Sequence, residues 1–283
     1  MPPPSIGGGR WPCGRQSLPL GLSAPCPRVS RRGPTPSAPE RGQPLSPRQP
    51  IFNVPGVVLG LLASFFAVHL LLWALPAGES EWLTVALAFI PARIGGATDL
   101  PGGSVAVVTS FVTHQFVHGN LPHLLINSAW LLAFGSPIAR RTDPLRFIIF
   151  FLLCGIAGAL VYLALNGGAR ILVVGASGSI SGLMGASFRF IFRSIQGGAT
   201  GLANSSRTPL MSLVQTLQDR RILAVVTGWT LLNVLLAEGA AGLTEAAGIA
   251  WEAHLGGFYA GLLLYGFFDR PPPPLAEDAA PAE

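Results

Sequence analysis

The sequence predicts an all-α polytopic membrane protein, built as a six-transmembrane-helix bundle with both termini in the cytoplasm. Half of its 283 residues are hydrophobic and only 11% are charged, whereas a typical soluble domain carries about 25% charged residues. The apolar residues gather in long uncharged runs, and the arginines gather in alternate connections between those runs. Composition, run length and arginine placement therefore predict the same fold class.

Six uncharged runs account for the predicted spans, since a bilayer is crossed by about 20 apolar residues in a helix. The runs are Phe52 to Ala77, Gly119 to Ala139, Phe147 to Leu165, Ile171 to Phe188, Ile222 to Ala237 and Ala253 to Phe268.

Arginine indicates which side of the membrane each connection faces. Seven arginines precede the first span, three follow the second and five follow the fourth, whereas the alternate connections hold only Arg93 and Arg170. Cytoplasmic connections carry the excess of positive charge. Both termini are therefore predicted to lie in the cytoplasm.

The two ends of the chain differ in composition from the part between them. Residues 1 to 50 are rich in Pro, Gly, Ser and Arg, which predicts a disordered cytoplasmic tail. Residues 51 to 269 form the predicted six-helix domain, and residues 270 to 283 form a second disordered tail. Within the domain, residues 79 to 118 are expected to fold at the outer interface, and residues 194 to 219 are expected to be a flexible linker.

Composition also argues against several classes of function. Cys13, Cys26 and Cys154 show no metal spacing and cannot all pair. The carboxylates show no ligand spacing either, so no metal or organic cofactor is expected. Aromatic and basic residues do not interleave on a polar stretch, which argues against nucleic acid as a partner. The expected surroundings are a lipid bilayer.

Ser177 lies within an apolar run, in the stretch Gly175-Ala176-Ser177-Gly178. Small residues in a membrane helix usually mark close helix packing, and this is one interpretation of the stretch. The other is that Ser177 is a nucleophile, which requires a base to take its proton.

Three further polar residues lie inside predicted spans, where each needs a partner or a task. His123 and Asn127 are four residues apart and share one helix face. They either join two helices by hydrogen bonds or both donate a hydrogen bond to one and the same acceptor. His254 begins the sixth span; it is either an interfacial histidine bonded to water or the base for Ser177.

A nucleophilic serine also needs donors for the oxyanion that forms on attack. His123, Asn127 and the backbone N–H groups of Ala176 to Gly178 are candidates. Gly178 and Gly182 in the fourth span, and Gly257 and Gly261 in the sixth, have the spacing that allows two membrane helices to approach closely. Such an approach would bring Ser177 to His254.

At these residues the chain resembles the rhomboid family of intramembrane serine proteases. Three motifs carry the resemblance, in the family's order: His114-Gln115-Phe116-Val117-His118 leading to His123 and Asn127, then Gly175-Ala176-Ser177-Gly178, then Ala253-His254 with Gly257 and Gly261. The resemblance covers residues 52 to 268.

The resemblance implies an endopeptidase that cuts single-span membrane proteins near the outer end of their transmembrane helix. It implies a dyad of Ser177 as nucleophile and His254 as general base and acid, with His123, Asn127, Ala176 and Ser177 forming the oxyanion hole. Gly175, Gly178, Gly182, Gly257 and Gly261 would pack the helices at the site. We expect the protein in a bacterial inner membrane, with an organelle membrane as the alternative.

Two positions depart from the family's pattern. Well-known bacterial members carry an aromatic residue one turn after the serine, where this chain has Ser181. The first outer loop has Arg93 without a tryptophan before it. This arginine either anchors the loop to the protein or to lipid phosphate, or snorkels to the interface, and snorkelling is the favoured interpretation. An inactive rhomboid-like protein that binds and escorts membrane helices is the alternative function. A transporter is a more distant third, because no internal repeat is visible.

Overall fold

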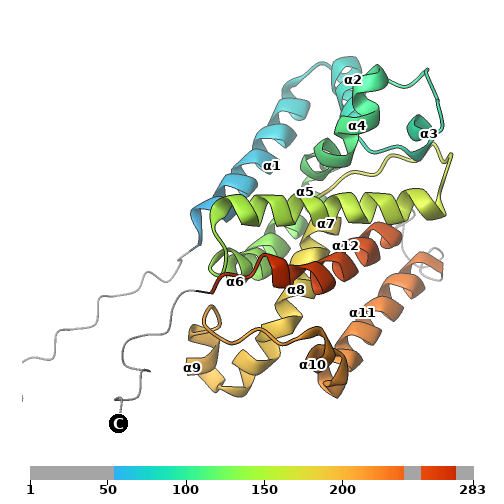
Figure 1. The fold of residues 1–283 in the computed structure, drawn as a ribbon. Coiled ribbons are helices and arrows are strands. Elements are labelled where there is room, and N and C mark those ends of the chain that lie inside the picture. Colours follow the sequence, from blue (N-terminus) through green and yellow to red (C-terminus); the bar gives the residue numbers. More distant parts are fainter. Residues whose placement is uncertain (1–53, 239–249, 272–283) are drawn as a thin grey trace, which may run out of the picture. The chain divides into compact units, whose positions relative to one another are not determined.

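The computed structural model describes residues 54–238 and 250–271 (Figure 1). Every element there is helical apart from one isolated β-bridge, which confirms an all-α fold for the described part of the chain. The predicted tail of residues 1 to 50 lies outside the described residues, as does most of the predicted C-terminal tail.

The helices are α1 Gly56–Ala74, α2 Ala77–Leu87, α3 Pro91–Ile94, α4 Gly103–Thr113, η1 His114–Phe116, α5 Leu121–Trp130, η2 Leu131–Gly135, α6 Ser136–Ala139, α7 Pro144–Leu165, α8 Ser177–Gln196, α9 Gly198–Ala203, α10 Leu213–Gln218, α11 Arg220–Glu238, α12 Trp251–Leu264 and η4 Tyr265–Phe267.

Local sequence explains where two of the long helices begin. The Asn120 side chain accepts a hydrogen bond from the His123 N–H, and Pro122 occupies the first turn of α5. Asp143 caps α7 in the same way, through the Arg146 N–H, and Pro144 follows it directly. Asn or Asp at the cap with proline in the first turn is a strong helix-start signal, because proline lacks an N–H where none is needed.

Three helical segments are long and apolar enough to cross a membrane: α1, the continuous rod from Leu121 to Ala139, and α7. The rod joins α5, the π-helical turn η2 and α6. Helices α8, α11 and α12 occupy the remaining predicted spans. Helix α8 is rich in Gly and Ser and most of its residues are buried, so protein surrounds it and it does not need an apolar outer surface.

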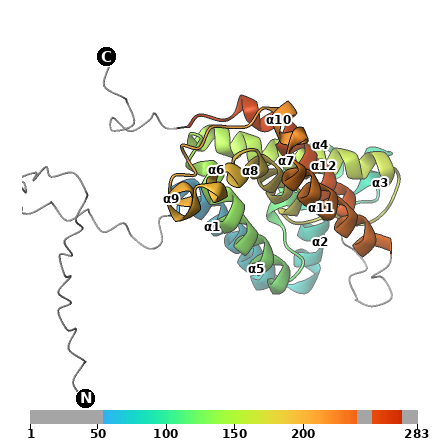
Figure 2. The ribbon, with the colours of Figure 1, turned by 90° about the horizontal axis from the view of Figure 1, so that it is seen from below.

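Helix α8 packs against α7 and α12, and α7 also packs against α12 (Figure 1). In Figure 1 α1 and α11 lie on opposite sides of these three helices, and in Figure 2 α1 and α11 are again apart. The largest apolar cluster includes Phe65 from α1, Phe151 from α7, and Leu183 and Phe190 from α8. The buried centre of the bundle is therefore α8, the helix that begins at Ser177.

The fourth predicted span differs from the structure at its start. It was expected to begin at Ile171, but the helix begins at Ser177. The preceding residues are extended, and Val173 exchanges two backbone hydrogen bonds of 2.9 and 3.0 Å with Phe89. Because an extended chain covers more distance per residue than a helix, this segment leads the chain to the buried start of α8.

The outer connection contains α2, α3, α4 and η1, and Arg93 lies at its centre. Arg93 is only 3% exposed, and its guanidinium donates to the carbonyls of Pro101, at 2.6 Å, and Val85, at 2.8 Å. The favoured interpretation of Arg93 as a snorkelling residue is therefore wrong, and the alternative, that it anchors the loop to the protein, agrees with these bonds. It holds two parts of the connection together, because a buried guanidinium must bond its donors to nearby acceptors.

An exposed ion pair joins this connection to the one after α7. The Arg170 guanidinium donates to both carboxylate oxygens of Asp99, at 2.7 and 3.0 Å, and this bonding holds the pKa of Asp99 below its ordinary value. Both side chains are well exposed, so the pair contributes little to stability.

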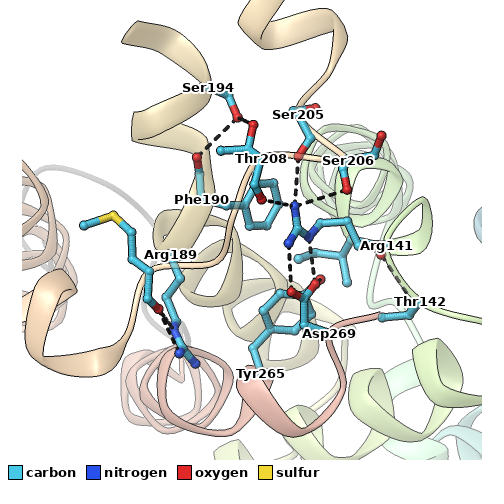
Figure 3. Close-up of polar contacts among 12 residues, drawn as sticks. Arg141, Thr142, Arg189, Phe190, Ser194, Ser205, Ser206, Thr208, Tyr265 and Asp269 are labelled. Carbon is cyan, nitrogen blue, oxygen red and sulfur yellow. Dashed lines mark hydrogen bonds and ion pairs between the residues drawn. The ribbon is translucent and has the colours of Figure 1, made fainter. Parts of the chain in front are cut away.

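The connection between α8 and α11 is not the flexible linker predicted from its Gly, Ser and Thr content. It forms α9 and α10, and Ser212 and Gln215 make a reciprocal capping box at the start of α10. The Arg189 guanidinium donates to the Met211 carbonyl at 2.9 and 3.1 Å, and the Ser194 and Thr208 hydroxyls lie 2.8 Å apart (Figure 3). Side chains of α8 therefore hold this connection in place, and sequence composition does not report such distant bonds.

Arg141 forms a buried polar cluster near the C-terminal end of α8, the end remote from Ser177. Its side chain is fully buried and donates to both oxygens of Asp269, at 2.7 and 2.8 Å. A third guanidinium nitrogen donates to the carbonyls of Ser205, Ser206 and Thr208 (Figure 3). The guanidinium also lies over the Phe190 ring, 4.4 Å from its centroid. One buried cation thus joins the residues that follow α6, the connection after α8 and the residues that follow η4.

Replacing Arg141 with Ala is expected to lower the free energy of unfolding by about 3 kcal/mol, because Asp269 is left buried without its partner. The matched control is Arg146→Ala, which breaks the exposed pair with Asp143 and is expected to cost less than about 1 kcal/mol. Denaturant titration of both variants in detergent micelles measures the difference. Equal effects of the two changes would contradict the assignment of Arg141 as the main lock.

Candidate active site

Ser177 is the first residue of α8, and the chain turns sharply just before it. Gly175 has a φ of 114°, a left-handed conformation that side chains disfavour. Its N–H donates to the His114 carbonyl at 2.9 Å. The end of the outer connection therefore fixes the turn that presents Ser177.

His254 lies on α12, and its Nε2 is 2.8 Å from the Ser177 Oγ. The two residues are 77 positions apart in the sequence. A distance of 2.8 Å between a hydroxyl and an imidazole nitrogen is a hydrogen bond. The structure thus brings together the two residues that sequence reasoning chose as nucleophile and base.

The glycines of α8 and α12 lie where the two helices touch. A Cβ on Gly257 would collide with the Gly178 carbonyl, and one on Gly261 would collide with the Gly182 carbonyl. Both contacts are backbone to backbone, so neither neighbour can move aside as a flexible side chain would. The close approach that holds His254 beside Ser177 therefore depends on hydrogen at these positions.

His123 and Asn127 lie on α5, facing the turn before Ser177. A Cβ on Gly175 would collide with the His123 ring and would lie 3.9 Å from Asn127 Nδ2. Asn127 Nδ2 donates one hydrogen bond to the His123 carbonyl at 3.0 Å, and its second N–H remains available. Ala176 is buried directly before α8. These predicted oxyanion residues thus lie around one turn, on the side where the first N–H groups of α8 have no intrahelical acceptor.

Asn233 is a site residue that the sequence analysis missed. Its Oδ1 lies 3.1 Å from His254 Nδ1, on the side of the ring away from Ser177. The signal was present, since Asn233 is a polar residue inside the fifth predicted span, where such residues need a partner. Ser181, one of the two positions that depart from the expected pattern, lines the cavity beside the site.

A cavity of about 570 Å³ opens onto Ser177 and His254. Its polar lining includes His123 and Asn127, and its apolar lining comes from α5, η2, α8 and α11: Ile126, Trp130, Phe134, Met184 and Trp229. Its size falls within the usual range for sites that enclose a small ligand or peptide segment. The hydroxyl and imidazole therefore face a space that another molecule can enter.

Within residues 54–238 and 250–271, no three His, Cys, Asp or Glu side chains lie close enough together to hold a metal ion. Cys154, the cysteine in that part of the chain, is buried and free. The chemistry available at the described site is thus that of a hydroxyl, an imidazole, amides and backbone N–H groups.

Replacing Gly257 with Val is expected to separate α8 from α12 and to lower the free energy of unfolding by about 1–3 kcal/mol, the usual cost of overpacking. Gly228→Ala is the control, because a Cβ at Gly228 meets nothing within 4 Å. Thermal unfolding in micelles compares the two. A Gly257→Val protein as stable as the parent would contradict the close helix contact.

Comparison with known proteins identifies the family of the chain. The family model described as "Rhomboid domain" matches residues 106–271, which is more than half of the chain and includes Ser177 and His254. The chain is also similar to "RHOMBOID-like protein 4" of Arabidopsis thaliana, with 28% identity over 153 residues. That match covers 53% of this chain and 31% of the relative. Because the family match covers more than half of the chain and three helical segments are long and apolar enough to cross a membrane, this chain is an integral membrane protein of the rhomboid family.

Proposed function

We propose that the protein is an intramembrane serine endopeptidase that cuts single-span membrane proteins near the outer end of their transmembrane helix. The observation that carries the proposal is the 2.8 Å hydrogen bond between Ser177 Oγ and His254 Nε2, at the wall of a cavity. A serine hydroxyl is a weak nucleophile until an adjacent base takes its proton. Ser177 supplies the hydroxyl and His254 supplies the base, and the two are already hydrogen-bonded.

The reaction follows from this pairing. His254 Nε2 accepts the Ser177 proton while Oγ attacks the scissile carbonyl carbon, and the carbonyl oxygen takes the negative charge. When the tetrahedral intermediate collapses, the C–N bond breaks and His254 gives the proton to the leaving amine. Water then attacks the acyl-enzyme with the same base, and this second step releases the acid product and restores Ser177.

The oxyanion would form beside the start of α8. The first backbone N–H groups of a helix have no intrahelical acceptor, and the positive end of the helix dipole favours an anion there. The Asn127 amide and the His123 ring lie against the same turn. We assign these groups and the N–H of Ser177 to the oxyanion hole, because donors fixed before the reaction stabilise the developing charge.

The substrate class follows from the cavity walls. Residues of α5 and of α11 line the same cavity, so a membrane-embedded segment would enter between these two helices. A helical substrate hides its scissile carbonyl in an intrahelical hydrogen bond. Segments with glycine or proline near the cut unwind most readily and are the preferred substrates in this proposal.

The placement in the membrane is also part of the proposal. We infer six spans, with α8, α11 and α12 joining the three segments that are apolar enough by themselves, and both termini in the cytoplasm by the arginine distribution. A bacterial inner membrane is the proposed location, and no metal or cofactor is required.

An inactive rhomboid-like protein that binds and escorts membrane helices is the second candidate. Ser181 favours it, because this small side chain replaces the aromatic ring expected beside the base. Binding alone requires the cavity but not proton transfer between Ser177 and His254. Hydrolysis of a model substrate separates the two candidates.

The full-length protein in micelles is expected to cleave a model single-span substrate with a glycine-rich outer end. Ser177→Ala and His254→Ala are each expected to abolish detectable cleavage, since each removes one half of the proton transfer. Ser187→Ala is the control, because this α8 serine donates to the Leu183 carbonyl away from the cavity. Gel analysis measures the product; substrate that binds but remains intact with the parent protein would support the escort function instead.

Asn127→Ala is expected to lower kcat by about 10²-fold, the usual effect of removing one oxyanion donor, with little change in KM. The matched control on α5 is Ser128→Ala, since the Ser128 hydroxyl donates to the Leu124 carbonyl within the helix. Steady-state cleavage kinetics separate kcat from KM. An Asn127→Ala enzyme with unchanged kcat would remove Asn127 from the oxyanion hole.

A further inference from the structure

A second hydrogen bond fixes the His254 ring from the side opposite to Ser177. His254 Nδ1 lies 3.1 Å from Oδ1 of Asn233, a residue on α11 that is only 4% exposed. Asn233 Nδ2 donates to the Trp229 carbonyl at 2.8 Å. Because a carbonyl accepts and never donates, this bond requires the amide nitrogen to face Trp229. The amide oxygen must then face His254.

We propose that Asn233 is a positioning residue that holds His254 in the tautomer with its proton on Nδ1. The proposal rests on the proposed endopeptidase function, and it adds a third member to the pair of Ser177 and His254. An amide oxygen only accepts hydrogen bonds, so Nδ1 must carry the proton that it donates to Asn233. The lone pair of Nε2 then faces the Ser177 hydroxyl.

The tautomer matters because neutral imidazole carries one proton on either ring nitrogen. In the other tautomer Nε2 would hold the proton and could not accept one from Ser177. During attack the ring becomes an imidazolium, and its Nδ1–H would keep its bond to Asn233 in a charge-assisted form, which is stronger than a neutral bond. Asparagine has this role beside the histidine of papain-like cysteine proteases.

Asn233 also restrains the orientation of the ring. The residue one helical turn after Ser177 is Ser181, whose small side chain has no ring that could stack on the imidazole. Hydrogen bonds at Nδ1 and Nε2 hold opposite sides of the imidazole, from α11 and from α8. Two such bonds define the ring plane without a stacked aromatic group.

A second side-chain bond between α11 and α12 provides a matched control. The Thr230 and Tyr259 hydroxyls lie 2.8 Å apart, whereas the two ring nitrogens of His254 bond Asn233 and Ser177. Thr230→Val removes this bond and preserves the shape of the side chain. This variant therefore weakens the contact between α11 and α12 but leaves both hydrogen bonds of the imidazole in place. It tests whether that helix contact alone explains any loss of activity.

The first experiment uses the unmodified full-length protein in micelles, labelled with nitrogen-15 at its five histidines. Nuclear magnetic resonance distinguishes protonated from unprotonated ring nitrogens, and His254→Ala identifies the signals of His254. We expect Nδ1 protonated and Nε2 unprotonated above the pH at which the ring becomes neutral. A His254 ring with its proton on Nε2 would overturn the proposal, whatever the activity of the protein.

The second experiment compares cleavage by Asn233→Leu, Asn233→Asp and Thr230→Val. Leucine removes the acceptor, and kcat is expected to fall about tenfold or more while KM changes by less than about twofold. Aspartate restores an acceptor oxygen at the same position and should keep kcat within about threefold of the parent. Thr230→Val should behave as the parent.

The outcomes separate this proposal from the proposed function. If the parent protein cleaves no substrate, the endopeptidase function fails, and the tautomer measurement still tests the role of Asn233. If the parent cleaves and Asn233→Leu retains full kcat, the proposal for Asn233 is overturned. It is overturned equally if Thr230→Val and Asn233→Asp lose as much kcat as Asn233→Leu, because helix docking alone would then explain the loss.

Discussion

The site depends first on one contact, the approach of the α8 and α12 backbones at their glycines. Gly257 and Gly261 lie against the carbonyls of Gly178 and Gly182, where no Cβ fits. The first of these contacts lies within one turn of both Ser177 and His254, so the helix separation there also sets the distance between hydroxyl and imidazole. The same close contact therefore packs the two helices and places the Ser177 hydroxyl beside the His254 imidazole.

The two ends of α8 are held by different means. At its end, Arg189 and the Arg141–Asp269 cluster join α8 to the following connection and to α12 through many buried bonds. At its start, the His114 carbonyl holds the turn at Gly175, and a cavity opens beside Ser177. A bundle held together at one end can keep an open cavity at the other without losing its packing.

Sequence reasoning predicted much of this fold because its main signals are local. Apolar runs and caps predict helices, and the spacing of Gly178, Gly182, Gly257 and Gly261 predicts a close helix pair. It failed where residues distant in the sequence decide the structure. The composition of the connection after α8 predicts a flexible linker, but hydrogen bonds from Arg141 and Arg189 to its backbone carbonyls hold it in place. Asn233 was missed for the same reason, since its role depends on where α11 places it beside His254.

The central claim is that Ser177 is activated by His254 in a cavity that another molecule can reach. Mass spectrometry of the detergent-solubilised protein after exposure to a fluorophosphonate tests it most directly, because this reagent reacts with activated serines: the serine oxygen bonds to phosphorus and fluoride leaves. The account predicts a single adduct on the peptide that contains Ser177 and its loss in His254→Ala. An unmodified Ser177, or an adduct that forms equally well without His254, would contradict the account.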